Sequence, residues 1–205
     1  MVFFGDSITD SGRDRDDPGS LGDGYVQQVA AELADRGDPA RVTNVGISGN
    51  RAVDLAARWD ADVEPLLPDV LTIFVGVNDT WRRFDQGLLT PADAFAQTCR
   101  GLVARARAVG VGRLVIMEPY LLPVTDEQFG WLDDLAGKRA ALREIAAEAG
   151  AQFIGLHGIL TAAAETAGAA ALAPDGVHPS RAAVDLIARS WLRCHDQPGL
   201  TILDY

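Results

Sequence analysis

The sequence predicts a three-layer α/β/α sandwich built around a parallel sheet. Five apolar runs of strand length alternate with amphipathic helical stretches along the 205 residues. Strands that are separated by helices connect in parallel, and the crossover helices cover both faces of the sheet. The run over residues 70–75 is apolar at every position except Thr72, which is typical of a strand buried on both faces.

Apolar spacing and turn-forming residues place the elements in chain order. The expected strands cover residues 2–4, 41–45, 70–75, 114–117 and 152–156. Helical periodicity predicts helices near residues 25–36, 52–59, 92–109, 135–149 and 180–192, with an Ala-rich helical stretch before residue 173. Gly37 and Gly150 suit helix ends, and Pro179 suits the first turn of the last helix.

Length and charge limit the class of protein. A chain of this size has room for a substantial core, and we expect a single domain over residues 1–205. The net charge of −11 argues against nucleic acid and anionic membrane surfaces as partners.

The sequence also bears on location and on metal binding. No apolar run approaches the ~20 residues that span a membrane. The N-terminus shows no basic segment followed by an apolar core, so a cytoplasmic protein is expected. Cys99 and Cys194 lie far apart, each in a helical pattern, which predicts buried free thiols. No metal-ligand spacing is present, and no metal site is expected.

Residues that carry chemistry collect in turns that follow the predicted strands. Gly5-Asp6-Ser7 comes directly after the first strand, and residues 46–50 and 76–79 follow the second and third. Parallel strands end at one sheet edge, where open α/β sheets bind their ligands. Ser7 is therefore a candidate nucleophile, although a Gly-Asp-Ser tripeptide is also common in ordinary turns.

A base and an acid for Ser7 lie near the other end of the chain. A serine hydroxyl is a weak nucleophile without a neighbouring base. Of the three histidines, only His178 has an acid close by in a turn, namely Asp175. Asp175 is placed to accept the second ring N–H, as the third member of a catalytic triad does. Asp175-Gly176 is equally a common turn, and His178 also suits a surface position before a helix.

Two further turns contain candidate donors to an oxyanion. These are the backbone N–H of Gly49 and the side-chain amide of Asn78, together with the N–H of Ser7 itself. Glycine at position 49 allows a close approach of the backbone to a substrate. The segment around Gly49 also fits a plain turn, and Asn78-Asp79 also fit helix caps. Jointly, the four turns are much harder to explain by chance than any one of them.

These four blocks resemble the GDSL, or SGNH, hydrolase superfamily. The matching residues are Gly5-Asp6-Ser7-Ile8-Thr9, Gly49 within residues 46–50, Gly76-Val77-Asn78-Asp79, and Asp175-Gly176-Val177-His178-Pro179. The resemblance implies a flavodoxin-like sandwich of five parallel strands in the order 2-1-3-4-5. It also implies hydrolysis of esters by a serine enzyme without a cofactor. No Gly-Xaa-Ser-Xaa-Gly elbow occurs, which separates the chain from the α/β-hydrolases.

A closer resemblance is to the acetylxylan esterase branch of this superfamily. The stretches that carry it are residues 5–13, 24–26, 44–59 with Asp62-Val63, and 76–82. The branch removes acetyl groups from xylan or xylo-oligosaccharides, so a small-molecule or oligosaccharide ester is the implied substrate. Trp81 and Arg82 would lie at the mouth of the site, and together with Asp6 they are candidate substrate contacts. Trp59 and Trp81 fit equally well as core residues.

Two alternatives to an acetyl esterase stay open, and a third is not supported. The first is a short-chain lipase, lysophospholipase or thioesterase of the same superfamily, and the second is a non-catalytic carbohydrate-binding protein. The third, a nucleotide or flavin protein, would need a phosphate-binding loop, and no stretch matches one. Loops 12–24 and 118–131 are expected to set specificity. The apolar loop 118–131 suits a lid, a packed segment or the interface of a homo-oligomer.

Overall fold

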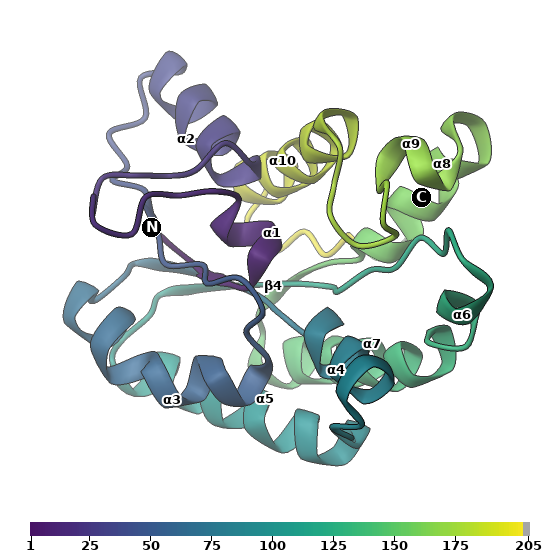
Figure 1. Cartoon of the computed structure of the whole chain (residues 1–205). Coiled ribbons are helices and arrows are strands. Elements are labelled where there is room, and N and C mark those ends of the chain that lie inside the picture. Colours follow the sequence, from purple (N-terminus) through teal and green to yellow (C-terminus); the bar gives the residue numbers. More distant parts are fainter. Residues whose placement is uncertain (203–205) are drawn as a thin grey trace.

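The computed structural model describes residues 1–202 and contains a five-stranded parallel sheet between two layers of helices (Figure 1). The strands, in the order β2-β1-β3-β4-β5, are β1 (Val2–Gly5), β2 (Thr43–Asn44), β3 (Val70–Phe74), β4 (Arg113–Met117) and β5 (Gln152–Ile154). All neighbouring strands pair in parallel. The predicted fold class and strand order are confirmed.

Each face of the sheet is covered by its own helices. One face carries α2 (Tyr25–Asp35) and α10 (Arg181–Asp196), with α8 (Leu156–Ala167) and α9 (Ala169–Leu172) beside α10 (Figure 1). The other face carries α3 (Ala52–Asp62), α5 (Ala92–Ala108) and α7 (Leu132–Ala149). The remaining helices are α1 (Ser7–Asp10), α4 (Val77–Gln86) and α6 (Asp126–Phe129), and residues 64–66 form a short 3₁₀ turn.

Alternation along β1 divides the buried apolar residues between the two faces. Phe3 belongs to the core beneath α2 and α10, where its ring lies 5.1 Å from that of Trp191. Phe4 belongs to the opposite core, edge-on to the fully buried Trp59. Trp191 also donates from Nε1 to Thr72 Oγ1 at 2.9 Å, which satisfies the one polar side chain of β3. The core alternative for Trp59 therefore holds.

Several elements differ from the expectation. The second strand is two residues long instead of five, and it lies at the edge of the sheet with only β1 as a neighbour. Its backbone still donates from Val45 and Ile47 to Phe3 and Gly5 of β1. The last helix begins at Arg181, after Pro179. Helices α1, α4 and α6 were not predicted, since α1 and α6 are single turns and α4 is mostly polar.

Both ends of the described chain are tied to the sheet. The Met1 amino group donates to the Arg41 carbonyl at 2.7 Å, beside the start of β1. Ile202 pairs with Ile154 at the outer edge of β5. Cys99 and Cys194 are buried free thiols, as predicted. Within residues 1–202, no helix has the length and apolar character to cross a bilayer.

Loop 118–131 packs mainly against its own chain. Tyr120 and Leu121 are fully buried, and Leu122 and Trp131 nearly so. Phe129, at the end of α6, is the one large apolar side chain of this loop that is mostly exposed, at 61%. The packed-segment alternative therefore accounts for the apolar character of the loop.

A buried ion-pair cluster joins α4 to α7. Lys138 is 1% exposed and pairs with Asp134 one helical turn away. The same carboxylate accepts from Thr80 Oγ1 and from Arg83, both at 2.7 Å. Burial raises the pKa of Asp134, but these hydrogen bonds outweigh burial and hold it below the ordinary value.

We predict that Asp134→Ala destabilises the protein strongly, because it leaves the Lys138 ammonium buried without its partner. Breaking a buried pair costs about 3–5 kcal/mol, which for a chain of this size corresponds to a fall in Tm of at least ~6 °C. The matched control is Glu148→Ala, which removes an exposed pair with Arg100 and should leave Tm nearly unchanged. Equal Tm values for the two variants would contradict the prediction.

Candidate active site

Ser7 lies where β1 turns into the single-turn helix α1. Asp6 is the N-cap of α1, and its Oδ1 accepts from the N–H of Ile8 at 3.1 Å. Ser7 is the first residue of the helix, so its own N–H has no acceptor within the helix. The serine is half-buried at the carboxyl edge of the sheet, as the sequence predicted.

The structure brings Ser7, His178 and Asp175 into one hydrogen-bonded chain. His178 Nε2 lies 2.9 Å from Ser7 Oγ, across 171 residues of sequence, and His178 Nδ1 lies 2.5 Å from Asp175 Oδ2. A carboxylate can only accept, so Nδ1 carries the proton and the neutral ring presents Nε2 as an acceptor to the serine hydroxyl. This arrangement can remove a proton from Ser7 and hold the charged imidazole that results.

Asp175 divides its two oxygens between the backbone and the ring. Oδ1 accepts from the N–H groups of Val177 and His178, at 2.9 and 2.7 Å, which leaves Oδ2 for the imidazole. Partial burial raises the pKa of Asp175, but the hydrogen bonds from His178 and the backbone outweigh burial and lower it overall. The carboxyl group is therefore held in its ionised form.

Loop 118–131 supports the turn that carries Asp175. Buried Gln128 donates from Nε2 to the Asp175 carbonyl at 2.6 Å, and Leu122 N–H donates to the Gly176 carbonyl at 2.9 Å. Gly176 has φ of +85°, and a Cβ there would lie 2.7 Å from the Gln128 side chain. Gln128 could not be identified from the sequence, because nothing local distinguishes it from the exposed residues beside it.

The candidate oxyanion donors lie around the turn after β2. Gly49 has φ of +83°, and a Cβ at this position would meet nothing within 4 Å, so the turn borders open space. Asn78, buried at the start of α4, donates one amide hydrogen to the Asn50 carbonyl at 3.1 Å. Its Nδ2 has a second hydrogen, which suits an oxyanion beside Gly49.

Neighbouring carboxylates fix the backbone on both sides of Gly49. Asp10 Oδ2 accepts from the N–H of Ser48 at 2.9 Å. Asp79 Oδ2 accepts from the N–H of Ala52 at 3.0 Å. Asp79 is fully buried, and burial raises its pKa to about 7. The turn is thus held by side chains from α1 and α4.

Aromatic side chains lie beside the triad. The Trp81 ring centroid is 6.0 Å from that of His178 and 5.6 Å from that of Trp131, on which Phe84 stacks at 5.4 Å. Arg82 lies over the Trp81 ring and contacts Asn78 Oδ1 at 3.4 Å. Trp81 and Arg82 are both half-buried near the triad, which is compatible with their expected place at the mouth of the site.

Asp6 occupies a different environment from the one expected. Its side chain is 1% exposed, and no hydrogen bond to Oδ2 is present among the described residues. Burial raises the pKa of Asp6 to about 7. Such burial does not fit a direct contact with substrate, so in this structure Asp6 acts as the cap of α1.

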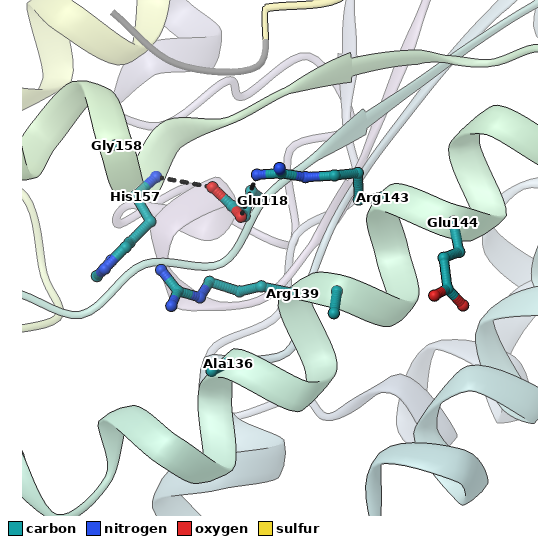
Figure 2. A pocket seen from close by; sticks show the side chains of 8 residues that line it. Glu118, Ala136, Arg139, Arg143, Glu144, His157 and Gly158 are labelled. Atoms are coloured by element: carbon teal, nitrogen blue, oxygen red, sulfur yellow. Dashed lines mark hydrogen bonds and ion pairs between the residues drawn. The ribbon is translucent and has the colours of Figure 1, made fainter.

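A separate cavity of about 380 Å³ lies between α7 and the start of α8 (Figure 2). Its central polar groups pair with one another: Glu118 accepts from the N–H of His157 at 3.1 Å and lies 3.8 Å from Arg143 (Figure 2). None of the triad residues lines this cavity. Within residues 1–202, no group of three or more His, Cys, Asp or Glu side chains is arranged to hold a metal ion.

Known proteins are similar to this chain in both sequence and fold. The acetylxylan esterase of Geobacillus stearothermophilus is 35% identical over 94% of this chain and 92% of its own length. The solved structure of that organism's acetylxylan esterase Axe2 has a TM-score of 0.88 at 34% identity, covering 97% of this chain and 94% of Axe2. Axe2 has also been solved as catalytic mutants at a serine and at a histidine.

A second solved relative, from Parabacteroides merdae, is described as a GDSL-like lipase. It has a TM-score of 0.89 at 29% identity, covering 95% of this chain and 94% of that one. The model of the GDSL-like Lipase/Acylhydrolase family matches residues 3–186, which include Ser7, Gly49, Asn78, Asp175 and His178. The chain therefore belongs to the GDSL-like lipase/acylhydrolase family, as its four sequence blocks predicted.

Proposed function

We propose that this protein is a serine esterase that removes acetyl groups from xylan or xylo-oligosaccharides. The observation that carries the proposal is the hydrogen-bonded chain from Ser7 Oγ through His178 to Asp175, with distances of 2.9 and 2.5 Å. Membership of a family of ester hydrolases and the similarity to an acetylxylan esterase support it.

In the acylation step, Ser7 Oγ attacks the ester carbonyl while His178 Nε2 takes its proton. Asp175 stabilises the imidazolium through the short hydrogen bond to Nδ1. The carbonyl oxygen becomes negatively charged and receives hydrogen bonds from the N–H groups of Ser7 and Gly49 and from the Asn78 amide. The imidazolium then gives its proton to the leaving alcohol, a sugar hydroxyl.

In the deacylation step, water replaces Ser7 as the nucleophile, and Ser7 becomes the leaving group. Water gives a proton to His178 Nε2 and attacks the acetyl-enzyme carbonyl, and the same donors hold the second oxyanion. The imidazolium returns its proton to Ser7 Oγ as acetic acid leaves, and the acid then loses its proton to solvent.

The aromatic side chains beside the triad support a sugar ester as substrate. Trp81 is half-buried, its ring packs 5.6 Å from that of buried Trp131, and indole rings are suited to stacking on sugars. A polar sugar and a small acetyl group fit a site rimmed by tryptophan and arginine better than a long acyl chain does.

Replacing Ser7 with Ala should abolish hydrolysis of p-nitrophenyl acetate and leave Tm unchanged, because the serine hydroxyl bonds only to His178 among the described contacts. The matched control is Ser190→Ala in α10, where the hydroxyl bonds to the Leu186 carbonyl away from the triad. The control should keep full activity. Retained hydrolysis in the Ser7 variant would refute Ser7 as the nucleophile.

The substrate is tested with acetylated xylo-oligosaccharides and with p-nitrophenyl esters of increasing acyl length. We expect the highest kcat/KM for acetyl esters and a steady fall with longer acyl chains. Trp81→Ala should raise KM for the oligosaccharides more than for p-nitrophenyl acetate, whereas Trp81→Phe should keep most of the affinity. A preference for long acyl chains would favour the lipase or thioesterase alternative, and binding without turnover would favour the carbohydrate-binding one.

The buried Asp6 carboxyl predicts a dependence of stability on pH. Its pKa is about 7 in the folded protein, against 3.8 for an aspartate exposed to water. Between these values the folded state holds a proton that the unfolded chain has lost, so stability falls as pH rises through this window.

Asp6→Asn should remove this contribution, because the amide oxygen can still accept from Ile8 N–H and the group does not ionise. We expect the variant to have a higher Tm than the wild type at pH 8 and little difference at pH 4. Each kcal/mol gained corresponds to ~2–4 °C for a chain of this size. Thermal unfolding measured from pH 4 to pH 8 tests it, and a parallel shift at all pH values would contradict it.

A further inference from the structure

Arg58 of α3 binds backbone and side-chain oxygens from three segments at the edge of the sheet. Nη2 donates to the Gly5 carbonyl at 3.0 Å, Nη1 to the Val45 carbonyl at 2.7 Å, and Nε to Asn50 Oδ1 at 2.7 Å. Nη1 also pairs with Asp62, one turn along α3. Four hydrogen bonds thus leave this single guanidinium, whose side chain is 14% exposed.

The fold creates the need for such a donor. β2 is an edge strand, so no strand lies on its outer side to donate to the carbonyls that point away from β1. The guanidinium lies over the Phe4 ring, with its centre 4.5 Å from the ring centroid. The planar fork of arginine reaches several acceptors at once, whereas a lysine ammonium acts as a point charge.

Two of the residues that Arg58 binds, Gly5 and Asn50, are close in sequence to a candidate oxyanion donor. Gly5 lies two residues before Ser7, and Asn50 directly follows Gly49. The Asn50 carbonyl in turn accepts from Asn78 Nδ2 at 3.1 Å. Arg58 is therefore linked indirectly to all three donors. The link runs along the chain to Ser7 and Gly49, and through Asn50 to Asn78.

We propose that Arg58 is a positioning residue that keeps Ser7, Gly49 and Asn78 in one oxyanion-binding arrangement. The inference rests on the proposed function, since it assigns Arg58 a role in the same esterase reaction. Arg58 acts through Asn50 and through the carbonyls of β1 and β2, and it does not contact the substrate.

The test compares Arg58→Lys with Arg113→Lys. Arg113 is a matched control, because it donates to the Cys194 carbonyl at 2.6 Å and contacts His195 at 3.1 Å and Gln152, but lies at the start of β4, away from the catalytic edge. Arg58→Lys should lower kcat for p-nitrophenyl acetate ~10–100-fold, less than the ~10²–10³-fold cost of losing an oxyanion donor outright. KM and the shape of the pH profile should stay the same. Arg113→Lys should lower Tm and keep kcat.

Asn50→Ala is the second variant, and it tests the positioning role of Arg58 if Arg58→Lys does not fold. It removes only the acceptor of Arg58 Nε and keeps the backbone carbonyl that Asn78 uses. A fall in kcat of ~3–10-fold is expected, within the range that small misplacements cause. When Asn50→Ala is combined with Arg58→Lys, we expect little further loss of kcat, because both substitutions break the same contact.

Unchanged kcat in Asn50→Ala, together with a kcat in Arg58→Lys equal to that of Arg113→Lys, would overturn the inference. Measurements are made well below the Tm of each variant, so that unfolding does not imitate a loss of rate. Ser7→Ala is assayed in parallel. Residual activity in Ser7→Ala refutes the proposed function itself, whereas an inactive Ser7→Ala beside a fully active Arg58→Lys refutes only the role of Arg58.

Discussion

The parallel pairing of β1 between β2 and β3 is the constraint on which the site depends. β1 leads into Ser7, the chain after β2 leads into Gly49, and the chain after β3 leads into Asn78. Because all three strands end at one edge, their turns lie together without any special folding of the loops. A slip in register would move the nucleophile along the strand axis relative to the oxyanion donors, so the ladder fixes their relative heights.

The sequence was sufficient for those parts of the site that follow directly from strand order. Buried strands ending in Gly, Ser and Asn predicted which residues meet, and the turn from Asp175 to His178 supplied the base and the acid. The contacts of Arg58 and Gln128 could not be predicted, because each joins segments far apart in the chain with no local pattern. The sequence did contain a signal for α4, because Val77, Trp81 and Phe84 recur at helical spacing. The polar residues between them obscured this pattern.

Two buried carboxyl groups lie beside the catalytic residues. Asp6 precedes Ser7 and Asp79 follows Asn78, and burial raises the pKa of each to about 7. Burying an acid costs stability unless its oxygens are bonded. Each uses one oxygen to hold a backbone N–H at the site, while the other oxygen has no hydrogen-bond partner among the described residues. The protein thus gives up stability at the positions that fix the turns after β1 and β2.

The two halves of the site are supported by separate groups. Arg58, with Asn50, holds the sheet edge that carries the nucleophile and the oxyanion donors, whereas Gln128 holds the turn that carries Asp175. The only described hydrogen bond that joins Ser7 to this turn is the one from Ser7 Oγ to His178 Nε2. A shift in loop 118–131 would therefore move His178, the base, while the oxyanion donors stay in place. It follows that substitutions near Gln128 should act on proton transfer, while those near Arg58 should act on stabilisation of the oxyanion.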